Sequence, residues 1–362
     1  MLTWCAEPPM FILAITLRTR TRGAAVTPVE QSRAESAPAE AGWCSGFLTR
    51  PEGTIAAPGP TSLRNVITVA LKGGLGNQLF QFALGRRLAV GRDADLSFDL
   101  SWFGNELATE TPRTYALAPY ELDVSLDGAH HPSSRPTPKT RIGRFLRRRD
   151  ALLISQSRPG YDSAVLDAPD GALLDGYWQS ERYFLDVARR IREELSLSNP
   201  PEGNNADLLS RIESPSSVGI HIRRGDYLTN RQARAFHGMP GTDWYRRAVD
   251  LIATRIDGVE LFVFSDDPDW SEAEFRPEHP TTYIRHNRRA PHEDLRLLAG
   301  CSHHVLANSS FSWWGAWLGE KPGQHAVAPS PWFRNAPGAH RDVVPARWTT
   351  LPMDVSSLQP QA

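Results

Sequence analysis

The sequence predicts an α/β fold built on parallel β-sheets. Residues 65–71 are a short apolar run typical of a buried parallel strand, a glycine-rich loop follows at 72–78, and residues 79–88 have helical spacing. A strand, a glycine loop and a helix in this order open a doubly wound α/β domain. A similar pattern begins near residue 217, where we expect strands at 218–222, 261–264 and 304–307 and a helix at 244–256.

The length of the chain favours two domains, since 362 residues exceed the usual size of one. Residues 1–64 are rich in Ala, Pro, Ser, Thr, Glu and Gly and have no hydrophobic period, so we expect a disordered arm. We place an N-terminal α/β domain at 65–200, a C-terminal α/β domain at 201–350 and a tail at 351–362. One domain with a disordered arm also fits this length.

The composition excludes several classes of protein. Lys and Arg total 40 and Asp and Glu total 41, so the net charge gives no reason to expect a nucleic-acid partner. The cysteines Cys5, Cys44 and Cys301 form neither a disulfide framework nor a metal-binding spacing, which favours a reducing, cytoplasmic setting. No apolar stretch approaches the roughly 20 residues that span a bilayer.

The first candidate site segment is His221-Ile222-Arg223-Arg224-Gly225-Asp226, at the end of an expected strand. Ligands of parallel sheets lie beyond the carboxyl ends of the strands. Adjacent arginines there are costly to bury unless an anion meets them, and a guanidinium fork matches phosphate oxygens in pairs. We therefore expect a diphosphate. The alternative is a structural ion pair between Arg224 and Asp226 with Arg223 exposed.

The second candidate segment, residues 307–318, follows an expected strand and begins a helix. Its early positions hold Asn308, Ser309, Ser310 and Ser312. A serine there caps the first turn, and the free backbone amides with the positive end of the helix dipole favour a phosphate. Capping alone explains one serine and leaves at least one other hydroxyl for a ligand.

The third candidate segment is the loop Gly73-Gly74-Leu75-Gly76-Asn77-Gln78. Missing side chains let backbone amides approach a ligand closely. The loop is not a dinucleotide fingerprint, because Leu79 stands where a third glycine is needed, and it lacks the Lys-Ser/Thr ending of a P-loop.

The chain resembles the bacterial α-1,2-fucosyltransferases of glycosyltransferase family 11 over residues 66–332. The three segments above carry the resemblance, and two further segments support it: Gly176-Tyr177-Trp178-Gln179-Ser180 and Phe264-Ser265-Asp266-Asp267-Pro268. The resemblance implies a GT-B-like fold with two facing Rossmann-type domains, of which the N-terminal one lies on the acceptor side and the C-terminal one binds GDP-fucose. It also implies transfer of L-fucose from GDP-fucose to the 2-hydroxyl of a terminal β-galactoside on an oligosaccharide or glycolipid.

The resemblance also implies roles for individual residues. Arg223 grips the β-phosphate of the leaving group, His221 faces the nucleotide and Asp294 accepts hydrogen bonds from guanine. Ser310 and Ser312 contact the diphosphate, and Asn77 with the glycine loop closes the cleft. We group the following matched positions with them as donor-binding candidates: Gly74, Gln78, Arg224, Asn308 and Ser309.

The expected reaction is a single in-line displacement that inverts the anomeric carbon. Asp226 is the first candidate for a catalytic acid–base role, although it equally fits a partner that orients Arg224 or His221; His237 and Asp243 are further base candidates. We expect no metal or other cofactor, because Asp267-Pro268-Asp269 has the features of a strand-end turn rather than of a metal-binding Asp-x-Asp element. A fucosyltransferase of another linkage and a catalytically silent sugar-nucleotide-binding protein are the alternatives.

Two features of the sequence remain open. The Pro- and Arg-rich stretch at 128–150 ends in Arg147-Arg148-Arg149, and it is either a solvated connection or a basic surface for peripheral contact with a membrane that carries a lipid-linked acceptor. The 11 tryptophans serve either a sugar-binding cleft or ordinary packing.

Overall fold

The structure, a computed structural model, describes residues 65–104, 113–127, 152–225 and 230–353. These residues belong to one compact unit. The predicted N-terminal arm, the Arg147–Arg149 run and the candidate base Asp226 lie outside the described residues.

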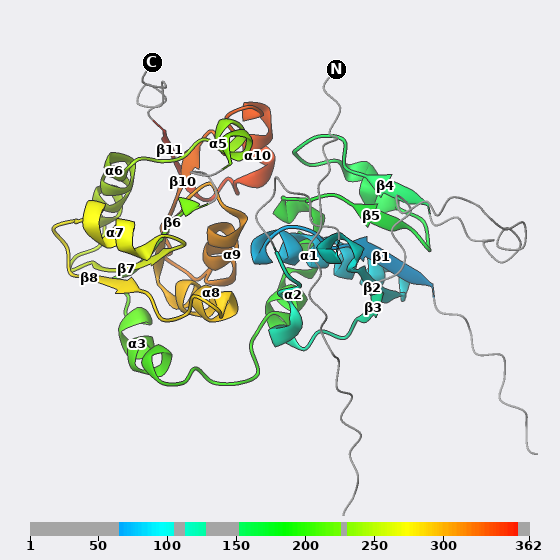
Figure 1. Ribbon diagram of the computed structural model, residues 1–362, viewed down its shortest axis with the longest axis horizontal. Coiled ribbons are helices and arrows are strands. Elements are labelled where there is room, and N and C mark those ends of the chain that lie inside the picture. Colours follow the sequence, from blue (N-terminus) through cyan, green and yellow to red (C-terminus); the bar gives the residue numbers. More distant parts are fainter. Residues whose placement is uncertain (1–64, 105–112, 128–151, 226–229, 354–362) are drawn as a thin grey trace, which may run out of the picture. The chain divides into compact units, whose positions relative to one another are not determined.

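The first sheet is parallel, and its five strands lie in the order β3-β2-β1-β5-β4. Its strands are β1 (Val66–Ala70), β2 (Asp95–Asp99), β3 (Ser125–Asp127), β4 (Leu153–Ser155) and β5 (Leu173–Asp175). Helix α1 (Leu75–Arg92) connects β1 to β2 and packs on both strands, as Figure 1 shows.

The second sheet is also parallel and has six strands in the order β11-β10-β9-β6-β7-β8. Its strands are β6 (Ser217–Ile222), β7 (Glu260–Ser265), β8 (Thr281–Ile284), β9 (His303–Val305), β10 (Ala326–Ser330) and β11 (Thr349–Pro352). Strand β6 is buried along its whole length, as is typical of an inner strand of a parallel sheet, and its polar residues Ser217 and His221 are buried with it.

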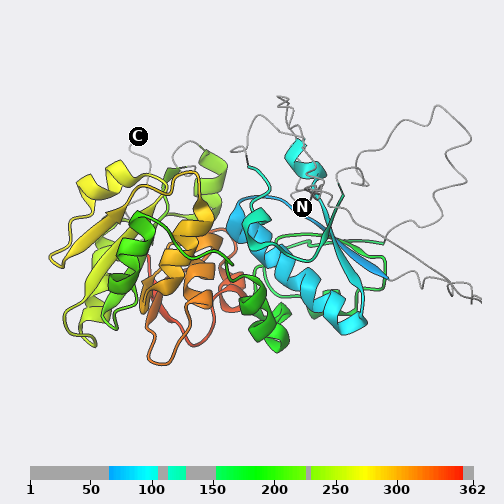
Figure 2. The ribbon, with the colours of Figure 1, turned by 90° about the horizontal axis from the view of Figure 1, so that it is seen from below.

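Helices connect these strands. They are α2 (Ala188–Glu194), α3 (Asn204–Ile212), α5 (Arg231–His237), α6 (Thr242–Ala253), α7 (Pro268–Glu274), α8 (Pro291–Gly300), α9 (Ser310–Leu318) and α10 (His340–Val343). Short 3-10 turns lie at Ser101–Gly104, Ala118–Tyr120, Ser163–Asp167, Glu181–Tyr183, Leu185–Val187 and Pro337–Ala339. Figure 2 shows α8 and α9 side by side, and the two helices are in contact.

The predicted α/β class with two parallel, Rossmann-type sheets is confirmed. The expected strands at 218–222, 261–264 and 304–307 correspond to β6, β7 and β9. One detail was wrong: α1 begins at Leu75 rather than at 79, because Gly74 is its N-cap, so Gly76 and Asn77 belong to the helix and not to the glycine loop. The domain boundary at 200 stays a prediction and falls between α2 and α3, while β11 extends two residues into the expected tail.

Most of the described tryptophans serve packing. Trp313, Trp314 and Trp317 of α9 are fully buried, and they share one hydrophobic core with Phe80 of α1. The ring centroids of Phe80 and Trp313 are 4.5 Å apart. Aromatic pairs at such distances add to the free energy of burying their area. The apolar contact between α1 and α9 therefore links the two sheets through a shared core.

None of the helices within the described ranges is both long and apolar enough to cross a membrane.

Candidate active site

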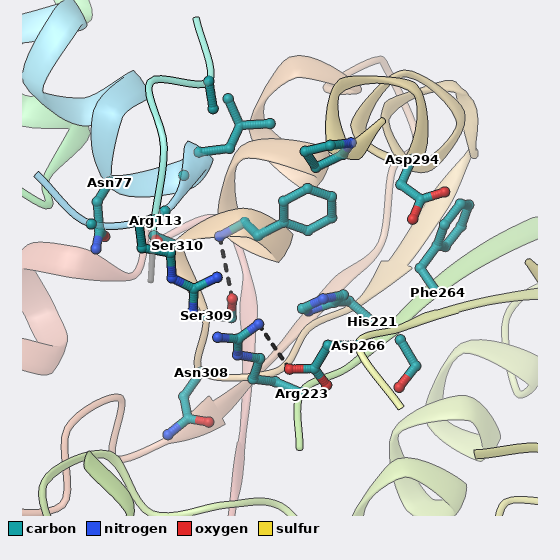
Figure 3. A pocket seen from close by; sticks show the side chains of 18 of the residues that line it. Asn77, Arg113, His221, Arg223, Phe264, Asp266, Asp294, Asn308, Ser309 and Ser310 are labelled. Atoms are coloured by element: carbon teal, nitrogen blue, oxygen red, sulfur yellow. Dashed lines mark hydrogen bonds and ion pairs between the residues drawn. The ribbon is translucent and has the colours of Figure 1, made fainter. Parts of the chain in front are cut away.

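A cavity of about 720 Å³ lies where strands of both sheets end. The segments after β1, β5, β6, β7, β8 and β9 all contribute lining residues, so the predicted rule that polar residues at carboxyl ends of strands form the site holds for both sheets. Figure 3 shows the cavity from close by. Among the predicted donor-binding residues, those that line it are Gly74, Asn77, His221, Arg223, Asp294, Asn308, Ser309 and Ser310.

Arg223 follows β6 and is held by a carboxylate of the next strand. Its Nη1 lies 2.8 Å from Oδ2 of Asp266, which follows β7, and the Arg223 side chain is only 19% exposed. In Figure 3 the Arg223 guanidinium points into the cavity beside Ser309. An ion pair with one carboxylate fixes one edge of the guanidinium plane and thereby orients the whole fork.

Arg224 has a different environment and does not line the cavity. Its guanidinium lies 3.9 Å from the centre of the Trp270 ring, and its Nε is 3.2 Å from Oδ2 of Asp267. Its backbone amide donates to Oδ1 of Asp266 at 2.8 Å. Arg224 therefore shapes the segment after β6 through a structural ion pair, here with Asp267, while the partner named in the alternative, Asp226, lies outside the described residues. The other part of that alternative was wrong, because Arg223 is largely buried rather than exposed.

The start of α9 brings serine residues and backbone amides to the cavity wall. Ser309 is the N-cap, and its hydroxyl accepts from the amide of Phe311 at 3.3 Å. Ser310 is the first helical residue and lines the cavity. Ser312 is 1% exposed, and its hydroxyl donates to backbone oxygens of Ala307 and Ser309. Its hydroxyl is therefore used inside the helix and does not join the site.

Asn308 fixes the backbone around this helix start. Its Nδ2 donates to the carbonyls of His237, Gly238 and Trp332 at 2.7, 3.2 and 3.4 Å. These bonds tie α9 to the segment after α5 and to the segment after β10. Asn308 lines the cavity, and its amide acts chiefly as a brace for the loops around it.

His221 is buried beside the cavity. Burial, together with the positive charge of Arg223, lowers the pKa of His221 to about 3, so the imidazole is neutral. Its Nδ1 is buried and has no hydrogen-bond partner among the described residues. A neutral imidazole with an unsatisfied nitrogen at a cavity wall is able to hydrogen-bond a ligand.

Asp294 on α8 is a second buried polar group with an unsatisfied atom. Its Oδ1 has no hydrogen-bond partner within the described part of the chain, and burial raises its pKa to about 6. Figure 3 shows this carboxylate pointing into the cavity on the side opposite Asn308. A carboxylate oxygen left without a donor is costly unless a ligand supplies one.

A network of amides holds Asp294 in this position. Asn287 stabilises the carboxylate form of Asp294 through a side-chain hydrogen bond. The Asn287 side chain exchanges two hydrogen bonds with Asn205 of α3, with N···O distances of 2.9 and 3.2 Å. Asn205 also contacts His286 and Glu293. Both asparagines are 7% exposed, so the network is preorganised.

The turn before α1 forms the opposite wall. Gly73 has φ +77°, a conformation that favours glycine, and Gly74 lies next to Arg113: a β-carbon at Gly74 would be 3.9 Å from the guanidinium. Arg113 lines the cavity and was not predicted from the sequence. Gln78 is fully buried and donates to the carbonyls of Gly73 and Thr114, so it braces this wall instead of reaching a ligand.

The base candidates separate in the structure. His237 lines the cavity, whereas Asp243 is 84% exposed on its side chain and pairs with Arg246 away from it. The residues that sequence reasoning missed include Arg113, Asp266 and Asn287. Only Asp266 carried a signal, as part of the segment after β7, because hydrogen-bond partners between distant loops are not visible in a sequence.

Comparisons with known proteins agree with this site. Residues 163–349 match the family model described as glycosyl transferase family 11. An α-1,2-colitosyltransferase of Escherichia coli is 31% identical over 303 residues, which cover 79% of this chain and 99% of that protein. The chain belongs to glycosyltransferase family 11.

Two further relatives differ in how much of them the chain covers. The O-antigen biosynthesis glycosyltransferase WbnK of Escherichia coli is 29% identical over 73% of this chain and 93% of its own length. Galactoside α-(1,2)-fucosyltransferase 1 of Sus scrofa is 27% identical over 40% of this chain and 42% of its own length. This family 11 protein is therefore a glycosyltransferase, as the sequence predicted, and the cavity is its candidate active site.

Proposed function

We propose that this family 11 glycosyltransferase transfers L-fucose from GDP-β-L-fucose to the 2-hydroxyl of a terminal β-galactoside. The observation that carries the proposal is the division of chemistry within one cavity: an unsatisfied carboxylate oxygen at Asp294, and a guanidinium with a helix start at Arg223 and Ser310. The carboxylate oxygen suits a nucleobase with adjacent hydrogen-bond donors, and the guanidinium with the helix start suits a diphosphate. Relatives named as α-1,2-colitosyl- and α-1,2-fucosyltransferases support the linkage.

The guanine proposal rests on donor and acceptor geometry. The pairing edge of guanine carries a ring N–H and an exocyclic amine next to each other, and a carboxylate accepts from both. Uracil does not present these two donors side by side. Asp294, held by Asn287, is thus proposed to select guanine over uracil, which makes GDP-sugars the expected donors.

Electrostatic stabilisation of the leaving group is the proposed source of most of the rate. Negative charge grows on the departing diphosphate as the fucose–phosphate bond breaks. Arg223 and the amides at the start of α9 are already oriented, by Asp266 and by the Ser309 cap, before the substrate arrives. Preorganised donors in a site that excludes water act most strongly on charge that develops in the transition state.

The acceptor hydroxyl attacks the face of the sugar opposite the diphosphate, so the configuration inverts from β to α. No metal ion is required in this scheme, because guanidinium and helix dipole supply the positive charge. His237 is the remaining base candidate that lines the cavity; Asp226 lies outside the described residues. Strong stabilisation of the leaving group reduces the demand for a base.

The test is a transfer assay with the purified protein. GDP-fucose and a lactose-type β-galactoside should give GDP and a product whose linkage analysis shows α-1,2-fucose, and UDP-sugars should give none. A product with another linkage would show that the α-1,2 proposal is wrong. GDP binding without any sugar transfer would favour the catalytically silent alternative.

A second donor has specific support. The relative that is 31% identical is named as a colitosyltransferase, so a nucleotide-linked colitose is the other donor to include in the assay. Preference for that donor would change the sugar and leave the roles of Asp294 and Arg223 unchanged. The acceptor is proposed to be an oligosaccharide or glycolipid of the cell surface, which a panel of galactose-terminated acceptors would test.

A further inference from the structure

The turn after β5, residues 176–179, contains the most unusual backbone conformation of the cavity wall. Trp178 has φ +51°, and it is 2% exposed. A positive φ is rare for a bulky residue other than glycine and costs on the order of 1–3 kcal/mol. Its neighbours Tyr177 and Gln179 both line the cavity, while Trp178 itself is packed in the core.

Hydrogen bonds from several elements impose this turn. Oε1 of Gln156 accepts from the backbone amides of Tyr177 and Trp178 at 2.9 and 3.1 Å. Gln81 of α1 donates to the carbonyl of Gly176 at 3.0 Å. A β-carbon at Gly176 would lie 2.6 Å from both the Gln156 β-carbon and the Trp178 ring, so only glycine fits there. Strain that the surroundings over-determine is typical of functional sites.

The two cavity-facing side chains of the turn are also held. Nε2 of Gln179 donates to Oδ1 of Asn77 at 2.8 Å. Lys72, paired with Asp175 at 2.6 Å, lies 5.1 Å from the centre of the Tyr177 ring. Each contact orients its side chain. For Gln179, the hydrogen bond to Asn77 uses one amide hydrogen, and the described residues leave its Oε1 and second amide hydrogen available to a ligand.

We infer that this turn is the acceptor subsite, which binds the neutral hexopyranose that receives the sugar. The inference rests on the proposed function. A primary amide offers a donor and an acceptor side by side, which matches two adjacent hydroxyls of a sugar ring. An aromatic ring offers an apolar surface for the C–H face of a pyranose and a polar edge. Tyr177 and Gln179 supply both features from one turn of the first sheet.

The 176–179 turn also differs in charge from the cavity wall of the second sheet, although Arg113 brings one charge to the wall of the first sheet beside Gly74. Arg223, Asp266 and Asp294 belong to the second sheet and suit the ionic donor, whereas the 176–179 turn presents uncharged polar and aromatic groups. A neutral sugar loses less hydration energy than an ion when it binds to such groups. Asn77 is then a positioning residue: it holds the Gln179 side chain, which contacts the acceptor sugar.

The experiment measures donor and acceptor parameters separately in Tyr177→Ala and Gln179→Ala. Each should raise the acceptor KM about tenfold or more, the equivalent of one or two lost contacts, while the Kd for GDP, measured by calorimetry, stays within about twofold. Tyr161→Ala is the matched control, because Tyr161 is an aromatic residue near the same sheet that does not line the cavity. Its acceptor KM should not change.

Gln156 separates positioning from general stability. Gln156→Ala removes the oxygen that accepts from two backbone amides and should raise the KM for the sugar acceptor. Gln156→Glu replaces this amide oxygen by a carboxylate oxygen and loses only the longer bond to the Gly160 carbonyl, so its KM should be closer to that of the wild type than to that of Gln156→Ala. If all variants transferred the sugar with an unchanged acceptor KM, or if GDP affinity fell as much as acceptor affinity, the inference would be overturned and the proposed function would stand. Absence of transfer by the wild-type protein would overturn the proposed function and the inference with it.

Discussion

Replacement of Asp294 by asparagine should make the protein more stable and its donor binding weaker. Burial raises the pKa of Asp294 from 3.8 to about 6, with Glu293 raising it and Asn287 lowering it. The folded protein therefore ionises this group less readily than the unfolded chain does. The resulting cost is absent below about pH 4 and fully present above about pH 6. At about 1.4 kcal/mol per pKa unit, it amounts to at most about 3 kcal/mol at pH 7.

Asparagine carries no charge, so Asp294→Asn should raise the free energy of unfolding at pH 7, and the gain should disappear as the pH falls from about 6 to 4. Besides Asn287, the group that acts on this carboxyl is Glu293. Of the other titratable groups nearby, His286 contacts Asn205, Arg296 pairs with Glu293, and Arg288 lines the same cavity. Thermal melts across this pH range measure the effect. Asp243→Asn is the matched control, because that carboxylate is 84% exposed.

The same substitution should weaken GDP binding at pH 7 by about 10- to 150-fold, since a hydrogen bond to a charged group is worth roughly 1.5–3 kcal/mol and an amide N–H would face a guanine donor. Wild-type affinity should itself fall about tenfold per pH unit below about pH 6, as the carboxylate is protonated. Calorimetry with GDP and UDP tests both statements. A variant that is less stable and binds GDP as tightly as wild type would show that the carboxylate serves the fold and not the donor.

Four further predictions follow from the site and the fold. Arg223→Ala should lower kcat/KM by roughly 30- to several-thousand-fold, because truncating one partner of a desolvated charge pair costs about 2–5 kcal/mol. Arg223→Lys should also have a low kcat/KM. Circular dichroism and thermal melts check that both variants fold. Activity should persist in excess EDTA, and a requirement for added Mg²⁺ or Mn²⁺ in the transfer assay would contradict the scheme. A chain that starts at Ser62 should remain folded and active by the same assay, since residues 1–60 lack the apolar pattern needed for packing. Gly76→Ala should lower both the melting temperature and kcat, because the alanine β-carbon would lie 2.4 Å from the Ser310 carbonyl carbon. Gly91→Ala on the same helix is the control: its β-carbon would lie 3.7 Å from the nearest neighbouring atom, so this variant should be neutral or stabilising.

The sequence was sufficient for the parallel α/β class, for strands β1, β6, β7 and β9, and for several residues that follow these strands. The apolar run at 261–264 and the mostly apolar segment at 218–222 predicted buried parallel strands. The polar residues after such segments located Arg223, Ser309 and Ser310 at the cavity. These signals are local, because a strand and the residue that ends it are neighbours in the chain.

The residues that the sequence did not reveal act through contacts between distant segments. Arg113 lies next to Gly74 although the two are far apart in the sequence, Asp266 after β7 pairs with Arg223, and Asn205 of α3 bonds Asn287 in the connection after β8. Ser312 shows the opposite error: a hydroxyl near a helix start was assigned to a ligand, but the carbonyls one turn earlier already accept its hydrogen bond.

Gly76 shows why the glycine motif and the helix start depend on each other. The motif was interpreted as a loop whose backbone approaches a ligand, yet the backbone that Gly76 approaches is that of Ser310 and Phe311 at the start of α9. A side chain at Gly76 would push the two helices apart, and the Phe80–Trp313 contact one turn further along would open with them. The amides of α9 that are proposed to bind the diphosphate are thus positioned by helix α1. The proposed donor-binding geometry consequently depends on Gly76, a residue that makes no proposed contact with the donor.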